Sequence, residues 1–149
     1  GGYFFALGGS FLGGLLADRL TAKRTAGTAT VVLGIVWITF SMMEQHWDNR
    51  TLAMGFIFAE QFSIGIMTVS LFSIFMSVSW PVIAGTQFTT YMALLNVSGI
   101  AGTKLAGEMG NPPDYTMIYL GAGFAQIAFL LLLKKIDVGE TRRELGESE

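Results

Sequence analysis

The sequence predicts an all-α protein, a multi-pass transmembrane helical bundle. Of its 149 residues, 52% are hydrophobic and 13% are charged, whereas about a quarter of the residues of a soluble domain are charged. The charges are also unevenly placed, because Glu60 is the only charged residue between Arg50 and Lys104. A helix needs roughly 20 apolar residues to cross the hydrocarbon core of a bilayer. That stretch therefore has room for two crossings.

Short polar breaks divide the chain into apolar segments of membrane-spanning length. We expect five helices, at about 1–17, 25–43, 51–78, 82–107 and 115–133. They would form a transmembrane bundle over 1–135, followed by a charged tail over 136–149. Pro81 is expected at or just before the first turn of the fourth helix. The chain begins within an apolar run, so we expect the first helix to be truncated and the chain to be a fragment.

The basic residues predict how the helices are oriented, because Lys and Arg accumulate in short cytoplasmic loops. Five crossings put the first loop, the turn at Trp80 and the tail on one side. That side holds Arg19, Lys23, Arg24, Lys134, Lys135, Arg142 and Arg143. The tail is therefore predicted to be cytoplasmic. Trp47, Trp80 and Tyr115 lie at predicted helix ends, as interfacial aromatic residues do, but Trp37 does not fit that pattern.

Small residues at steps of three and four predict where helices pack, since they let backbones approach closely in lipid. The first segment carries a run of these residues, and the fourth and fifth carry shorter seams. The positions are Gly2, Ala6, Gly9, Gly13 and Ala17, then Gly99 with Thr103, Gly102 with Ala106, and Gly121 with Ala125.

Several classes of function lack the residues that they need. There is no cysteine and one histidine, so neither a Cys-based zinc site nor a histidine cluster can be assembled from this chain. No Gly-x-x-x-x-Gly-Lys-Ser/Thr loop is present, which argues against an ATP-driven pump. The net charge of −2 argues against a nucleic-acid partner. We expect no catalytic residues, no metal and no cofactor, and a lipid bilayer as the main partner.

The most specific motif is Gly14-Leu-Leu-Ala-Asp-Arg-Leu-Thr-Ala-Lys-Arg24. It resembles the cytoplasmic signature loop of the major facilitator superfamily, Gly-x-Leu-Ala-Asp-Arg-x-Gly-Arg-Lys/Arg. The candidate residues of this loop are Gly14, Asp18, Arg19, Lys23 and Arg24. Thr21 and Ala22 stand where the family has Gly and Arg. An acid in such a loop can make contacts in one conformation and lose them in another, although a positive-inside loop with an incidental acid is the alternative.

The resemblance implies a place in a larger fold. Each half of the family's fold is a six-helix repeat, and the motif follows the second helix and, in a weaker copy, the eighth. The five predicted helices would then be helices 8 to 12 of the transporter, with helices 2 to 6 as the alternative. In either register the missing helices of the same protein are a partner.

Two further stretches narrow the resemblance, Phe58-Ala-Glu-Gln-Phe-Ser-Ile-Gly65 and Ala84-Gly-Thr-Gln-Phe-Thr-Thr-Tyr-Met-Ala-Leu-Leu-Asn96. They are similar to the AmpG-like permeases of the peptide–acetyl-coenzyme A transporter group. That group imports muropeptides, certain siderophores or acetyl-coenzyme A. The resemblance implies a bacterial inner-membrane protein that couples import of a small solute to protons.

Glu60 is the proton-coupling candidate, because a carboxylate within a span is unfavourable unless it is paired, hydrated or protonated. Ser63 shares its helical face and is expected to be a local partner. The alternative is that Glu60 lies near the outer interface or belongs to a structural hydrogen-bond network.

Polar residues on the last two helices are candidates to line a substrate cavity, since polar atoms at this depth need partners. They are Gln87, Tyr91, Asn96, Lys104 and Gln126. Hydrogen bonding between helices is the alternative for the polar stripe of the fourth helix. For Lys104 the alternative is snorkelling to the interface.

These observations favour a proton-coupled secondary transporter that works by alternating access. Another substrate class, such as a siderophore, a sugar or a drug, stays open. So does a membrane sensor or scaffold that keeps the fold without transporting.

Overall fold

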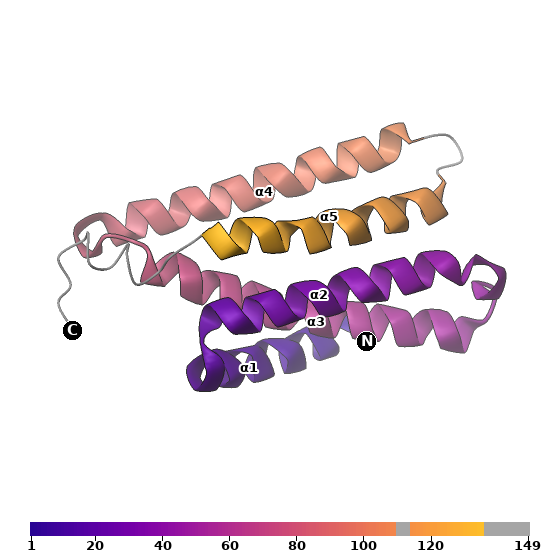
Figure 1. Ribbon diagram of the computed structural model, residues 1–149, viewed down its shortest axis with the longest axis horizontal. Helices are drawn as coiled ribbons and strands as arrows, with labels where there is room; N and C mark the ends of the chain where they lie inside the picture. The colour runs from indigo at the N-terminus through magenta and orange to yellow at the C-terminus, as the bar shows by residue number, and fades with distance from the viewer. Residues whose placement is uncertain (110–113, 136–149) are drawn as a thin grey trace. The chain divides into compact units, whose positions relative to one another are not determined.

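A computed structural model describes residues 1–109 and 114–135, and these residues are helical almost throughout (Figure 1). The elements in chain order are α1 (Gly2–Leu20), α2 (Ala22–Met42), η1 (Glu44–His46), α3 (Arg50–Ser77), η2 (Pro81–Ile83), α4 (Ala84–Glu108) and α5 (Tyr115–Lys135). The all-α prediction is confirmed, and the five predicted helices are present with ends within a few residues of those expected. The predicted tail over 136–149 lies outside the described residues.

Three of the helices, α2, α3 and α5, are long and apolar enough to cross a membrane. Large apolar side chains are also exposed on α1, where Tyr3, Phe4 and Phe11 have 86%, 79% and 71% of their surface accessible. Soluble monomers rarely expose contiguous apolar patches of this kind. These features indicate a membrane protein. Membrane crossing by α1 and α4 remains a prediction.

The chain divides into two compact units. The first unit contains α1, α2, α3 as far as Ser73, and α5. The second begins at Ile74 and contains the end of α3, η2 and α4.

Within the first unit, α1 and α3 meet at glycines. A Cβ on Gly9 would overlap the carbonyl oxygen of Phe62, and a Cβ on Gly65 would overlap that of Ala6. A Cβ on Gly13 would lie 2.8 Å from the Cα of Ile66. Such approaches of backbone to backbone require residues without side chains. The packing predicted for the small residues of the first segment is therefore confirmed at Gly9 and Gly13, which are both buried.

A second pair of glycines joins α2 to α5, which run alongside each other (Figure 1). A Cβ on Gly123 would lie 3.0 Å from the carbonyl oxygen of Gly34, and a Cβ on Gly34 would lie 3.1 Å from that of Gly123. The seam expected at Gly121 stays a prediction, because Gly121 is exposed and a Cβ there would meet no described atom within 4 Å. The interface with α2 uses Gly123.

α2 and α5 are also joined where α2 ends and α5 begins. Ser41 Oγ donates a hydrogen bond to the carbonyl oxygen of Thr116 at 2.8 Å, and Ser41 is buried. Leu33 is fully buried on α2, and Leu133 is buried near the end of α5. The core of the first unit therefore follows the length of α2.

The connection between α1 and α2 is a single residue, Thr21, whose φ is 139°. This is a conformation that residues with a Cβ rarely adopt. Thr21 also caps α2, because its Oγ1 accepts a hydrogen bond from the backbone N–H of Arg24 at 3.3 Å. The predicted signature loop is thus a sharp break between two helices rather than an extended loop.

In the second unit, the turn before α4 is built around Trp80 and Pro81. Trp80 is extended, and Pro81 opens the short helix η2 that leads into α4. Proline suits a first helical position, because it has no N–H to leave unpaired there. The position expected for Pro81 is confirmed. The seams expected at Gly99 and Gly102 stay predictions, because a Cβ at either position would meet no described atom within 4 Å.

Candidate functional site: a carboxylate in an aromatic pocket

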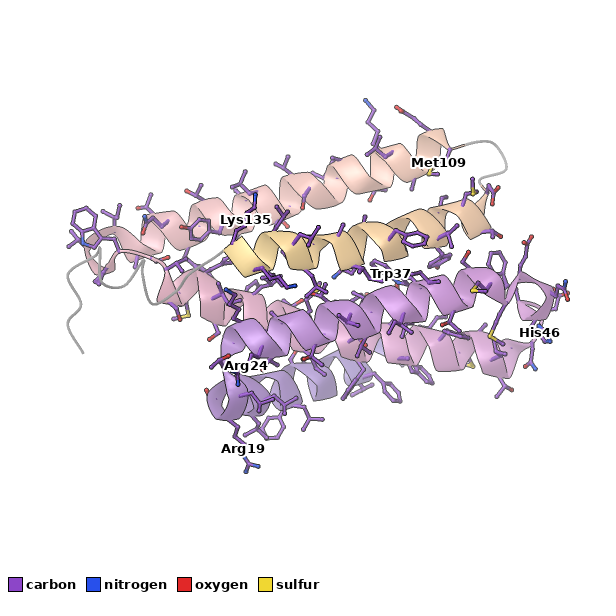
Figure 2. All side chains as sticks on the ribbon, viewed as in Figure 1. Arg19, Arg24, Trp37, His46, Met109 and Lys135 are labelled. Carbon is purple, nitrogen blue, oxygen red and sulfur yellow. The ribbon has the colours of Figure 1, made fainter. Side chains whose placement is uncertain are left out.

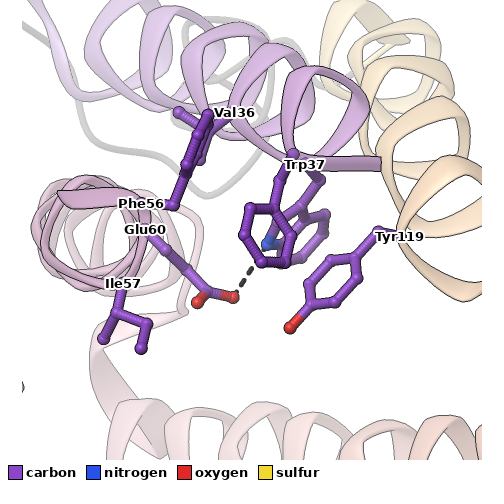
Figure 3. A pocket seen from close by; sticks show the side chains of 7 residues that line it. Val36, Trp37, Phe56, Ile57, Glu60 and Tyr119 are labelled. Carbon is purple, nitrogen blue, oxygen red and sulfur yellow. Dashed lines mark hydrogen bonds between the residues drawn. The ribbon is translucent and has the colours of Figure 1, made fainter. Parts of the chain in front are cut away.

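A small pocket lies between α2, α3 and α5 in the first unit and has a volume of about 90 Å³. Figure 3 shows one carboxylate, that of Glu60, among side chains that are otherwise apolar or aromatic. The lining residues are Val36, Trp37, Phe40, Phe56, Ile57, Glu60 and Tyr119.

Glu60 is held in this pocket by Trp37. The indole Nε1 of Trp37 donates a hydrogen bond to Oε1 of Glu60 at 2.8 Å (Figure 3), and the contact is partly buried. A hydrogen bond of this kind contributes about 0.5–3 kcal/mol, with the higher values for an ionised partner. The bond gives Trp37 a role that its place away from the helix ends left unexplained.

The pocket lies within the apolar length of its helices. Glu60 comes ten residues after Arg50, the first residue of α3, which corresponds to about 15 Å of helix rise. Trp37 precedes the end of α2 by five residues and Tyr119 follows the start of α5 by four, or about 6–8 Å. The pocket therefore lies at least a turn inside the ends of all three helices.

Phe40 is the centre of an aromatic cluster beside the pocket. Its ring centroid lies 5.0 Å from that of Phe56, 4.9 Å from that of Tyr119 and 5.2 Å from that of Trp47. Trp47 also donates a hydrogen bond from Nε1 to the carbonyl oxygen of Phe40 at 2.9 Å. Ring pairs at these separations contribute about 0.5–1.5 kcal/mol each beyond the burial of their area. The cluster fixes the wall from which Trp37 reaches Glu60.

Ser63 is not the partner of Glu60 that the sequence led us to expect. It is buried, and its Oγ donates to the carbonyl oxygen of Ala59 at 2.8 Å, one turn back in α3. Gln126 on α5 reaches α3 at a different place, where its Nε2 lies 2.9 Å from the sulfur of Met67. Gln126 is thus in the same unit as Glu60, but it does not line the Glu60 pocket.

Two of the cavity candidates, Gln87 and Tyr91, have structural partners in the second unit. Oε1 of Gln87 accepts a hydrogen bond from the backbone N–H of Trp80 at 2.6 Å, which ties the turn to α4. The ring of Tyr91 lies 5.0 Å from that of Phe75. Both side chains therefore support the turn between α3 and α4.

The remaining candidates lie further along α4. Lys104 is paired with Glu108 one turn on, at 4.0 Å, and their side chains are 78% and 66% exposed. Asn96 is exposed. Thr89 and Thr103 donate to the carbonyl oxygens of Gly85 and Gly99 in their own helix, at 2.7 and 2.9 Å. These hydroxyls are satisfied by the helix itself, so they do not depend on a ligand or a neighbouring helix.

The signature-loop residues lie around the break at Thr21. Asp18 and Arg19 are exposed at the end of α1, and a Cβ on Gly14 would lie 4.0 Å from Val69 of α3. Nζ of Lys23 donates to the carbonyl oxygen of Lys134 at 3.3 Å. This bond satisfies a carbonyl in the last turn of α5, where such groups have no partner in the helix.

Trp37 and Tyr119 are the site residues that sequence reasoning missed. The signal for Trp37 was present, since it is the tryptophan that falls away from a predicted helix end. Tyr119 gave no such signal, because tyrosine near the end of a membrane helix is ordinary.

Among residues 1–109 and 114–135, no group of three or more His, Cys, Asp or Glu side chains could hold a metal ion. Comparisons with protein-family models, with curated proteins and with solved structures gave no match to this chain.

Proposed function

We propose that the chain is part of a proton-coupled secondary transporter of the major facilitator type, in which Glu60 binds and releases the coupled proton. The observation that carries the proposal is a carboxylate within an apolar helix, in a pocket of about 90 Å³ where Trp37 donates its hydrogen bond. Ionisable groups placed in membrane helices at such a cost are characteristic of proton relays.

The position of the pocket also suits this role. Glu60 is contributed by α3, Trp37 by α2 and Tyr119 by α5. A movement of any one of these helices would change the surroundings of the carboxylate. A group whose protonation depends on helix positions can link proton binding to a conformational change.

The finer features of the proposal come from the sequence. They are the five crossings with a cytoplasmic tail, the place of the chain as helices 8 to 12, a bacterial inner membrane, and import of a muropeptide-like solute by an AmpG-like permease. Gln87, Tyr91, Asn96, Lys104 and Gln126 stay candidates for the substrate cavity.

The test uses Glu60→Gln, which keeps an oxygen that can accept the hydrogen bond from Trp37 but cannot take up a proton. The protein is reconstituted into proteoliposomes, and uptake of a radiolabelled anhydro-muropeptide is followed under an imposed pH gradient. We expect the variant to lose gradient-driven uptake and to retain counterflow exchange. Glu44→Gln, which alters an exposed acid in η1, is the matched control and should retain both.

Two results would contradict the proposal. Gradient-driven uptake by Glu60→Gln equal to that of the unaltered protein would remove Glu60 from the coupling. Uptake that persists when an uncoupler collapses the pH gradient would remove proton coupling altogether.

A further inference from the structure

A second hollow in the first unit lies at the end opposite the η1 loop. It is an open groove of about 560 Å³, formed mainly by one face of α2 with one residue each from α1 and α5. Its lining is Leu20, Arg24, Gly27, Thr28, Val31, Val32 and Leu130.

The groove has a polar end and an apolar length. Arg24 lies in the first turn of α2, and the other α2 residues follow it at steps of three, four, seven and eight, so they share one helical face. The face extends for about 12 Å along the helix. Thr28 adds no unpaired donor, since its Oγ1 bonds to the carbonyl oxygen of Arg24 at 3.0 Å. Gly27 places no side chain in the groove, where a Cβ would lie 3.5 Å from the side chain of Leu130.

Positive charge is concentrated at the polar end. Figure 2 shows Arg19, Arg24 and Lys135 at the same end of these helices, with His46 at the other. The bond from Lys23 to the carbonyl oxygen of Lys134 joins the start of α2 to the end of α5 there. Residues 18–24 and 134–135, all of them described, carry one acid, Asp18, and five basic residues, Arg19, Lys23, Arg24, Lys134 and Lys135.

We propose that this groove binds an anionic phospholipid, with the phosphate at Arg24 and an acyl chain along the apolar face of α2. The charge of the end matches an anionic headgroup, and the length of the groove matches a chain that continues into the bilayer. Basic clusters beside membrane helices attract anionic lipids, with each Lys or Arg strengthening binding about fivefold. The proposal rests on insertion in a membrane and is independent of transport.

Native mass spectrometry of the purified protein in detergent micelles tests the proposal. Phosphatidylglycerol and phosphatidylcholine with the same acyl chains are titrated separately, and the dissociation constant of the first bound lipid is measured. We expect phosphatidylglycerol to bind several-fold more tightly. Arg24→Gln should weaken its binding about fivefold and weaken phosphatidylcholine binding less, because the choline cation of that headgroup offsets the charge of its phosphate. Arg50→Gln, at the start of α3, is the charge-matched control and should change neither.

A second pair of variants tests the apolar length of the groove. Val32→Trp fills it and should weaken binding of both lipids, whereas Ile35→Trp alters a residue of α2 that is exposed outside the groove and should not. Arg24→Lys should keep the preference for the anionic lipid, which distinguishes loss of charge from misfolding of Arg24→Gln.

Equal affinity for the two lipids would overturn the proposal. So would equal effects of Arg24→Gln and Arg50→Gln, or of Val32→Trp and Ile35→Trp. Displacement of phosphatidylglycerol by millimolar inorganic phosphate would also overturn it, since a bare anion site needs no acyl chain. These outcomes do not depend on the uptake assay, so failure here and failure of the transport proposal are distinguishable.

Discussion

Thr21 is the residue with the most unusual backbone in the described chain. Its φ of 139° falls in a region that non-glycine residues enter only at a strain of about 1–3 kcal/mol. The family motif that the sequence resembles has glycine at this position. A glycine at this position would adopt such a backbone without that strain.

The strain at Thr21 predicts a difference in stability between two substitutions. Both remove the hydroxyl that accepts the hydrogen bond from the backbone N–H of Arg24. Thr21→Gly removes the Cβ as well, whereas Thr21→Ala keeps it. Glycine has more freedom in the unfolded chain, which offsets part of the strain that it relieves. We therefore expect the Thr21→Gly variant to be more stable than the Thr21→Ala variant by about 1 kcal/mol. Denaturant unfolding in micelles, followed by circular dichroism, measures the difference. An alanine variant as stable as the glycine variant would show that the break is unstrained.

At the scale of single residues, the sequence identified Glu60 but not the residue that binds it. Glu60 could be selected because a lone charge in a long apolar run is rare. Its partner, Trp37, could not be paired with it, because the two are separated by 23 residues and a contact between helices has no local signature. Ser63 was misassigned for a related reason. Serine on a helix can bond to its own helix one turn back, and it does so here.

At the scale of the helices, boundaries were predictable and contact faces only partly so. Charge-free length and polar breaks fix where helices start and stop. The face of a helix that packs on its neighbour depends on which of its glycines lies at the contact. Gly121 and Gly123 lie about 200° apart around α5. Only Gly123 meets α2. The run of small residues on α1 was more informative, because several steps of three and four define one face.

The contact between α1 and α3 yields a prediction at two adjacent positions of one helix. Gly9→Ala adds a Cβ that overlaps the carbonyl oxygen of Phe62, whereas Gly8→Ala adds one that meets no atom within 4 Å. Alanine favours a helix over glycine by about 1 kcal/mol, and overpacking costs about 1–3 kcal/mol. Gly8→Ala should therefore be neutral or stabilising, and Gly9→Ala should be less stable than it by about 2 kcal/mol.

The same unfolding measurement in micelles compares these two glycine variants. Equal stability of the pair would contradict the close packing of α1 on α3. The control is internal, since both substitutions are the same chemical change in the same helix.

For the whole molecule, the central claim is that all five helices cross the membrane. Three helices, α2, α3 and α5, are long and apolar enough by composition. The other two, α1 and α4, carry more glycine than α2, α3 and α5, which lowers their hydropathy but does not prevent crossing where helices pack together. With the first loop on the cytoplasmic side, five crossings place Lys135 on that same side. Crossings by α2, α3 and α5 alone would place Lys135 on the outside.

Cysteine accessibility in intact cells tests the crossing by α4 most directly, and the chain contains no cysteine to complicate labelling. Single cysteines replace Asn49, Ser79, Glu108 and Lys135 in turn, and each is probed with a membrane-impermeant maleimide. Five crossings predict that the cysteines at Asn49 and Glu108 are labelled from outside, and that those at Ser79 and Lys135 are labelled only after lysis. If α4 does not cross, the cysteine at Glu108 would be protected and that at Lys135 labelled from outside, which would contradict the account.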